Sequence, residues 1–315
     1  MGAPLRILFA GTPAFAVPPL EALLASPHRV EAVISQPDRP AGRGRRLQPP
    51  PVKQAALAAG IPVIQPERLA VPDLEAVARD GPPDLLVVVA FGQLLPAPVL
   101  DYPRHGALNV HASLLPRWRG AAPIARALLA GDGETGVSIM QMTTGLDAGP
   151  VLLQRRCPIG DADTAASLHE RLAELGATAL LEALEDLPAR LAAAQPQDET
   201  AVTRAPKLDR EEGRIDWSRP AAELERRVRA LQPWPAAWTL LDGEPLRIWA
   251  AQVLAAADPA GAEPGTVLGA GRDGIDVATG EGVLRLLEVQ PASRRSMRAA
   301  DLANARELDR CRLGR

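Results

Sequence analysis

Residues 84–90 read DLLVVVA, an apolar run in which no charge follows the first residue. A continuous run of this kind is typical of a strand buried on both faces of a parallel sheet, because helices cover both faces of such sheets. Shorter runs at 5–10, 29–35, 61–64 and 106–110 alternate with amphipathic stretches. This alternation predicts an α/β fold with an open, doubly wound and mainly parallel sheet.

Helices are expected between these strands. We expect one at 51–60 and a long one from about 164 to 191, where leucines recur at helical spacing. A further strand is expected at 136–142. Ligands of such sheets bind beyond the carboxyl ends of the strands. That rule directs attention to the segments at 11–14, 91–96, 109–119 and near Asp147.

The chain changes character after residue 192. Residues 193–208 are polar, contain two prolines and show no sustained periodicity, which is typical of an interdomain linker. Beyond them, a helix at 221–231 is followed by short alternating runs separated by turn signals, and then by a helix at 299–308. Short strands at this spacing predict a small β-barrel. We therefore expect a catalytic domain over 1–192, a linker over 193–208 and a second domain over 209–315.

Length and composition exclude several classes of protein. The chain has 315 residues, which favours two domains, and its 47% hydrophobic and 23% charged residues exclude a wholly disordered chain. No apolar stretch is long enough to predict a membrane span, and the first residues lack the apolar core of a signal peptide, so we expect a cytoplasmic protein. The two cysteines predict no disulfide framework, and we expect no metal site, because no Cys/His cluster has zinc spacing.

The net charge of −3 hides a basic segment. Residues 36–53 contain five basic residues and one acidic residue, a local charge of +4 in an acidic chain. Concentrated positive charge favours a localised anionic partner, although a solvated loop would have the same composition.

Residues 107–124, ALNVHASLLPRWRGAAPI, contain the densest set of polar groups. Asn109 and His111 are two positions apart near the end of an expected strand, so their side chains point to the same side. Residues 140–150, MQMTTGLDAGP, place Asp147 on a tight loop between two glycines.

These three residue types suit acyl transfer to an amine. Asn109 and a protonated His111 can donate hydrogen bonds to a developing oxyanion, and Asp147 can orient the imidazole or accept a proton. Each residue also has an ordinary explanation when it is taken alone: a turn-forming Asn, a structural His and an Asp that caps a turn.

The quoted motifs resemble the signatures of the 10-formyltetrahydrofolate-dependent formyltransferases. Residues 109–116 (NVHASLLP) with 117–124 (RWRGAAPI) resemble the first signature, and residues 145–147 (GLD) match the second. Other segments resemble the branch of that family that acts on tRNA. They are FAGTP at 9–13, QPDRPAGRGRRL at 36–47, VVVAFGQLLP at 87–96, IDW at 215–217, QPWPAAW at 232–238 and QPASRRSM at 290–297.

The resemblance implies a Rossmann-like catalytic domain, an OB-like C-terminal barrel and transfer of a formyl group from 10-formyltetrahydrofolate to methionyl initiator tRNA. It implies that Asn109, His111 and Asp147 are catalytic. The residues implied to contact the folate are Phe91, Gln93, Leu94, Leu95, Ser113, Leu114, Leu115 and Pro116. Those implied to contact tRNA are Arg39, Arg43, Arg45, Arg46, Lys53, Arg294 and Arg295. Arg298 is a further candidate beside the last two.

Three positions depart from the common form of the family, at Phe91, Ala112 and Ala148. A phenolic hydroxyl is missing at Phe91, where Tyr is usual, and the other two residues are small like those they replace. A monomer without a membrane partner is expected.

Other functions remain open on the sequence alone. Another folate enzyme could formylate a sugar nucleotide or a purine-precursor amine, or hydrolyse the formyl donor, with the same three residues. The basic segment and the second domain favour tRNA instead. A non-catalytic nucleic-acid-binding protein is disfavoured by the intact trio, and a nicotinamide dehydrogenase by the lack of G-x-G-x-x-G after the first strand.

Overall fold

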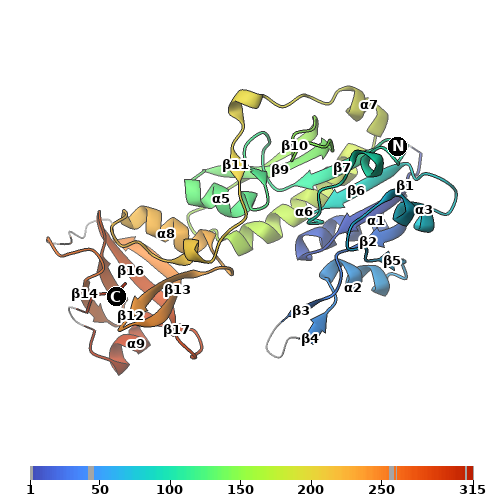
Figure 1. Cartoon of the computed structure of the whole chain (residues 1–315). Helices are drawn as coiled ribbons and strands as arrows, with labels where there is room; N and C mark the ends of the chain where they lie inside the picture. The colour runs from blue at the N-terminus through green and yellow to red at the C-terminus, as the bar shows by residue number, and fades with distance from the viewer. Residues whose placement is uncertain (1–2, 42–45, 255–258, 260, 309–310, 315) are drawn as a thin grey trace. The chain divides into compact units, whose positions relative to one another are not determined.

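The structure is a computed structural model that describes residues 3–41, 46–254, 259, 261–308 and 311–314. The chain divides into two compact units (Figure 1). The first unit comprises residues 1–123, 134–158 and 169–205, and the second comprises 124–133, 159–168 and 206–315.

A seven-stranded sheet forms the centre of the first unit. Its strands are β1 (Arg6–Gly11), β2 (Arg29–Ile34), β5 (Val63–Ile64), β6 (Leu85–Val89), β7 (Ala107–His111), β9 (Glu134–Gln141) and β10 (Val151–Pro158). They are ordered β10-β9-β7-β6-β1-β2-β5 (Figure 1). The five strands from β7 to β5 are parallel, whereas β9 runs antiparallel to both of its neighbours. The mainly parallel α/β sheet is confirmed, and β10 is a strand that the sequence patterns missed.

Strand β6 is buried along its whole length, as its unbroken apolar run predicts. Its side chains alternate between the two faces of the sheet. Leu86 and Val88 lie in one apolar cluster with Leu74 and Leu100. Leu85 and Val87 point to the other face and are also fully buried, so both faces of the sheet are covered.

Helices of the first unit are α1 (Val17–Leu24), α2 (Pro51–Ala58), α3 (Val71–Val77), α4 (Ala97–Leu100), most of α6 (Ala165–Leu184) and α7 (Leu187–Ala192). The long helix expected at 164–191 is therefore two helices. Pro188 has no backbone N–H to continue the α6 ladder, and the Asp186 side chain accepts from Ala189 N at 3.3 Å to begin α7.

Two small pairings lie outside the main sheet. The basic segment forms a hairpin of β3 (Arg39–Ala41) and β4 (Arg46–Gln48). In the segment expected to be a linker, Glu199–Ala201 form a 3-10 helix, and β11 (Arg204–Ala205) pairs with β8 (Arg119–Gly120). Residues 197–205 therefore form structure within the first unit, and not an extended spacer.

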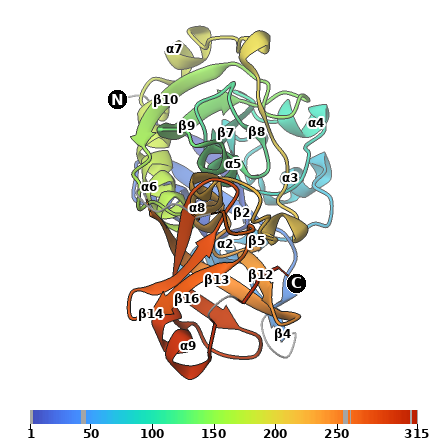
Figure 2. The ribbon, with the colours of Figure 1, turned by 90° about the vertical axis from the view of Figure 1, so that its left-hand side faces the viewer.

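The second unit contains an antiparallel sheet of β12 (Ala237–Leu241), β13 (Glu244–Leu254), β16 (Val283–Pro291), β15 (Gly274–Ala278) and β14 (Val267–Gly271), paired in that order, with β17 (Met297–Arg298) on β16. Strands β12, β13, β16 and β14 of this sheet are labelled in Figure 2. Its helices are α8 (Ala221–Ala230), α9 (Ala299–Ala305) and α5 (Pro123–Ala130). A separate antiparallel domain is thus confirmed. Among the described residues, the path of paired strands ends at β12 and β14 without closing into a barrel.

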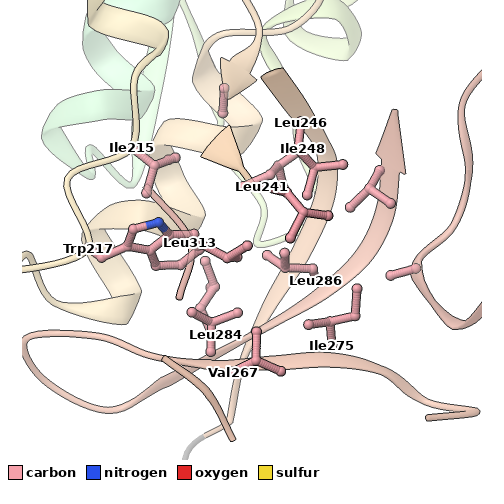
Figure 3. Close-up of a cluster of buried hydrophobic side chains, with 14 of the residues drawn as sticks. Ile215, Trp217, Leu241, Leu246, Ile248, Val267, Ile275, Leu284, Leu286 and Leu313 are labelled. Carbon is pink, nitrogen blue, oxygen red and sulfur yellow. The ribbon is translucent and has the colours of Figure 1, made fainter. Parts of the chain in front are cut away.

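The core of this unit lies on the inner face of the sheet. On β13, Leu246 and Ile248 alternate with the exposed Pro245 and Arg247, as expected for a sheet with one face covered; on β16, the half-buried Arg285 separates Leu284 from Leu286. Trp217 packs in the same cluster (Figure 3), and its Nε1 donates to Thr239 Oγ1 at 3.0 Å.

Candidate active site

Strand β7 presents the two polar side chains expected from residues 107–124. Asn109 and His111 are both buried, with relative exposures of 8% and 6%. Their spacing of two residues on one strand puts both side chains on the same face of the sheet. The flanking apolar residues Leu108 and Val110 fill the opposite face, so burial of the strand fixes the orientation of the pair.

Asp147 lies on the loop that follows a different strand, β9, and its side chain approaches Asn109 and His111. Strand β9 runs antiparallel to β7, and its last residue, Gln141, lies opposite Leu108. The loop after β9 then returns over the sheet. It brings Asp147 Oδ1 to 3.5 Å from Asn109 Nδ2, and Asp147 Oδ2 to 3.8 Å from His111 Nδ1. The structure therefore brings together the three residues predicted to be catalytic.

Two backbone groups fix the orientation of the carboxylate and the imidazole. Gly120 N donates to Asp147 Oδ2 at 2.8 Å, and His111 Nε2 lies 2.9 Å from the Trp118 carbonyl oxygen. Because a carbonyl oxygen only accepts, Nε2 carries the proton of this hydrogen bond. The other ring nitrogen, Nδ1, therefore faces the Asp147 carboxylate.

The Asp147 backbone adopts an uncommon conformation. Its φ of 49° lies in the left-handed region, which costs about 1–3 kcal/mol and persists only where surrounding contacts hold it. Gln197 Nε2 supplies two such contacts, by donating to the carbonyl oxygens of Asp147 at 2.8 Å and Gly149 at 2.7 Å. A side chain at Gly149 would lie 1.8 Å from the Gln141 carbonyl oxygen, so only glycine fits where the loop meets β9.

The segment 91–95, predicted to contact folate, is largely occupied by the fold. Phe91 and Leu95 are buried in the apolar cluster beside β6. The Gln93 amide accepts from Leu69 N at 2.9 Å and donates to the carbonyl oxygens of Pro66 and Glu67. Leu94, at 81% exposure, is the side chain of this segment that faces solvent. In this conformation, Phe91, Gln93 and Leu95 can therefore contact a folate only through their backbone groups.

The loop 113–116, the other segment predicted to contact folate, is held by hydrogen bonds from its neighbours. Ser113 Oγ donates to the Arg117 carbonyl at 2.6 Å, and Ser138 Oγ donates to the Ser113 carbonyl at 2.7 Å. The Leu114 side chain packs against the backbone at Gly136, and Leu115 is buried. The loop therefore offers mainly backbone groups and the half-buried Pro116 to a ligand.

The residues predicted to contact tRNA lie in two places. In the first unit, Arg39 is exposed on β3, while Arg43, Arg45 and the Arg46 side chain lie outside the described residues. In the second unit, Arg294 and Arg295 are exposed in the turn between β16 and β17. Gln290 Nε2 holds that turn by donating to the Arg294 carbonyl at 2.8 Å.

Lys53 has a different environment from the arginines. Its ammonium donates to both Asp38 carboxylate oxygens at 2.8–2.9 Å and to Gln65 Oε1 at 2.7 Å. The Gln65 amide and the Lys53 ammonium hold the pKa of the Asp38 carboxyl below its usual value. These contacts tie the base of the β3–β4 hairpin to α2, so the charge of Lys53 is largely compensated within the protein.

Sequence patterns missed the groups that support the site. Arg119, Gln197 and Thr203 were not among the predicted site residues, yet they contact the loops that hold His111 and Asp147. Gln197 and Thr203 occur in a polar stretch whose composition cannot be distinguished from that of a solvated linker. No signal in that stretch would have identified them.

The described residues contain no cluster of three or more His, Cys, Asp and Glu side chains that could hold a metal ion. No helix in the described part of the chain is long and apolar enough to cross a membrane. Both cysteines, Cys157 and Cys311, are free thiols.

The first unit thus carries an Asn–His–Asp cluster on a parallel-rich α/β sheet, and a separate antiparallel domain follows it; these side chains suit the transfer of a group to an amine. A family model described as formyl transferase matches residues 5–184, and the model of its C-terminal domain matches residues 207–307. The chain belongs to the formyl transferase family and is a transferase.

Individual relatives extend this result. The chain is 56% identical over 311 residues to the methionyl-tRNA formyltransferase of Methylococcus capsulatus (strain ATCC 33009 / NCIMB 11132 / Bath), with 98% of this chain and 100% of the relative covered.

Two solved structures show the same fold at low identity. HypX from Aquifex aeolicus, in complex with tetrahydrofolic acid, is 20% identical with a TM-score of 0.65, over 95% of this chain and 46% of HypX. An N-formyltransferase from Helicobacter canadensis, in complex with folinic acid and dTDP-3-aminofucose, is 15% identical with a TM-score of 0.64, over 91% of this chain and 99% of the relative.

Proposed function

We propose that this chain transfers the formyl group of 10-formyltetrahydrofolate to the α-amino group of methionyl initiator tRNA. The products are N-formylmethionyl-tRNA, which serves translation initiation, and tetrahydrofolate. The observation that carries the choice of substrate is the 56% identity to a methionyl-tRNA formyltransferase along nearly the whole chain. Because the similarity includes the basic segment and the second unit, it extends beyond the catalytic residues alone.

The buried polar cluster supports the first chemical step. The unprotonated methionyl amine attacks the formyl carbon, and the carbonyl oxygen becomes an oxyanion. The Asn109 amide and Nδ1 of a protonated His111, whose Nε2 is held by the Trp118 carbonyl, can donate to that oxygen from positions fixed by the fold. Donors that need no reorganisation during the reaction stabilise the tetrahedral intermediate more than they stabilise the planar substrate.

The carboxylate supports the second step. The attacking amine must lose a proton, and N10 of the folate must gain one as its bond to the formyl carbon breaks. Asp147 lies within reach of both Asn109 and His111, so it can orient the imidazole and assist this proton transfer directly or through water. Electrons from the broken C–N bond remain on N10, so the step needs no oxidant or reductant.

The folate would bind between segments 91–95 and 113–116. Leu94 supplies an exposed apolar side chain for the folate ring, and the backbone of Ser113–Pro116 supplies polar groups. Phe91, Gln93, Leu95, Leu114 and Leu115 then act by shaping the two segments, because their side chains are occupied within the fold.

Basic residues of both units would contact the tRNA. Arg39, Arg43, Arg45 and Arg46 of the basic segment 36–53 would approach the phosphates of the acceptor end, with Lys53 anchoring the β3–β4 hairpin. Residues 209–315 would form an OB-like barrel that adds Arg294 and Arg295 as a second basic surface. Under this division, 1–192 is the catalytic domain and 193–208 connects it to the second domain. The enzyme would act as a monomer in the cytoplasm, which size-exclusion chromatography and fractionation would test.

A formyl-transfer assay with matched acceptors tests the function. The purified chain and 10-formyltetrahydrofolate are incubated with methionyl initiator tRNA, with methionyl elongator tRNA, with methionine amide or with an amino sugar nucleotide. We expect rapid transfer to methionyl initiator tRNA and much slower transfer to the other acceptors. Faster transfer to the sugar nucleotide, or hydrolysis of the donor without an acceptor, would assign a different member of the family.

A further inference from the structure

Residues 197–205, here called the strap, cross the loops that hold His111 and Asp147. Strap residue Thr203 accepts from Trp118 N through Oγ1 at 2.8 Å and from Arg119 N through its carbonyl at 3.0 Å. The following residues pair with β8, where Ala205 lies so close that a side chain at Gly120 would come within 2.5 Å of its carbonyl oxygen. The strap therefore fixes the backbone of residues 118–120 at three successive positions.

That short backbone stretch contacts both catalytic side chains. The Trp118 carbonyl accepts from His111 Nε2, and Gly120 N donates to Asp147 Oδ2. Arg119 lies between them and is only 2% exposed. Any shift of this residue would therefore move the two groups that orient the imidazole and the carboxylate.

Arg119 is itself held by the strap. Its Nε donates to Gln197 Oε1 at 2.9 Å, and its two terminal nitrogens donate to the Glu199 carboxylate at 2.8 and 3.2 Å. A bidentate arginine–carboxylate pair of this kind restricts both partners in direction as well as distance. The hydrogen bond from Arg119 lowers the pKa of the Glu199 carboxyl, so this group stays charged at neutral pH.

The same contact sets the direction of the Gln197 amide. Because Oε1 accepts from Arg119, Nε2 must point the other way, and there it donates to the Asp147 and Gly149 carbonyls. These are the contacts that hold Asp147 at its left-handed φ of 49°. The result is a continuous path of hydrogen bonds from Glu199 through Arg119 and Gln197 to the backbone of the loop that carries Asp147.

We infer that Gln197 and Arg119 are positioning residues for formyl transfer, with Gln197 holding the Asp147 loop and Arg119 orienting Gln197. The inference rests on the proposed function, and it gives the strap a part in catalysis beyond that of joining two domains. Neither residue needs to touch substrate, since each acts through the placement of Asp147. Their loss should therefore lower kcat and leave the binding of both substrates nearly unchanged.

Gln197→Met tests this inference, because methionine keeps the length of the side chain and removes both donors. We expect kcat to fall by roughly 10- to 100-fold, the range caused by a misplaced reacting group, with KM for methionyl-tRNA and Kd for 10-formyltetrahydrofolate unchanged. The matched control is Gln195→Met, just outside the strap, where the exposed amide donates to the carbonyl of Ala193. This control should behave as the wild type does.

The outcomes separate this inference from the proposed function. If wild type and Gln195→Met formylate methionyl-tRNA and Gln197→Met matches them in kcat, the positioning role is wrong. If the wild type does not formylate methionyl-tRNA, the proposed function fails instead. Should Gln197→Met lose folate binding through misfolding, Glu199→Gln decides. That change keeps an oxygen at residue 199 that can accept from Arg119, but it removes the negative charge of the Glu199 carboxylate. An unchanged kcat would overturn the inference.

Discussion

The catalytic loops and the basic hairpin of the first unit differ in how firmly they are held. Asn109, His111 and Asp147 come from segments that are buried or bridged by backbone hydrogen bonds. On the hairpin, Arg39 and Leu47 are exposed, and the connection to the rest of the unit runs through Asp38 at its base.

This difference matches the two kinds of work that the proposed function requires. Stabilising an oxyanion needs donors fixed to within a fraction of an ångström, because misplacement quickly removes their advantage. Attraction to phosphates acts over several ångströms and tolerates movement, so exposed arginines on a hairpin suffice. A substitution in the cluster should therefore affect the rate of the chemical step, and one in the hairpin should affect tRNA binding.

The largest effect is expected from Asp147→Asn. The amide keeps the shape of the side chain but cannot accept a proton or carry charge toward His111, so kcat should fall by roughly 100- to 10,000-fold. Binding of 10-formyltetrahydrofolate, measured by equilibrium titration, should persist. Asp101→Asn, at an exposed position after α4, is the control. Near-normal turnover by Asp147→Asn would remove the carboxylate from the mechanism.

Gly149→Ala should have the next largest effect, on stability as well as rate. A methyl group there would lie 1.8 Å from the Gln141 carbonyl oxygen, so the loop that carries Asp147 must move away from β9. We expect a loss of about 1–3 kcal/mol in the free energy of unfolding, measured with urea, together with a lower kcat. At Gly133, no described atom lies within 4 Å of an added methyl group, so Gly133→Ala should change neither quantity. Equal behaviour of the two variants would contradict the close approach.

Lys53→Met should shift tRNA binding alone. Loss of the ammonium leaves Asp38 with Gln65 and loosens the hairpin base, so KM for methionyl-tRNA should rise roughly two- to fivefold with the folate Kd unchanged. The pKa of Asp38 is lowered in the folded protein, so this anchoring is present above the ordinary aspartate pKa and is lost as the pH falls through the folded value.

The wild type should therefore lose tRNA affinity at acid pH through this group, and Lys53→Met should show less of that loss. Filter binding of methionyl-tRNA across the acid range measures both. Gln54→Met is the control on the same helix, because its amide donates to the Pro49 carbonyl and not to Asp38. A rise in KM for Gln54→Met equal to that for Lys53→Met would point to a general effect on α2.

Features with strong local patterns could be predicted from the sequence. The apolar run at 84–90 placed β6 within one residue, and the two-residue spacing of Asn109 and His111 placed both on one face of β7. Asp147 was expected near them from a rule about carboxyl ends, yet β9 is antiparallel and the loop has to return over the sheet. Tertiary structure, which the pattern does not contain, brings the carboxylate there.

The strap and Lys53 show where local patterns fail. Residues 193–208 have the composition of a solvated linker, and only the buried Arg119 turns Gln197 and Glu199 into structural contacts. Lys53 adds one positive charge to the net charge of the basic segment, although the Asp38 carboxylate neutralises this charge in the folded protein. Pairing of charged and polar groups depends on partners far along the chain, so composition alone cannot reveal it.

The smallest effect is expected from Arg39→Ala, and it concerns salt dependence more than affinity. An arginine that neutralises one phosphate releases about one counterion, so its loss should make the slope of log K against log salt shallower by roughly 0.7–0.9. Arg29, exposed at the opposite end of β2 from the hairpin, provides the matched control, and Arg29→Ala should keep the wild-type slope. Because attraction to phosphates tolerates small displacements, Arg39→Ala should leave kcat at saturating tRNA unchanged, whereas Gly149→Ala should not. A lowered kcat for Arg39→Ala would mean that the hairpin takes part in placing the amine, and the division between a buried catalytic cluster and an exposed binding surface would no longer hold.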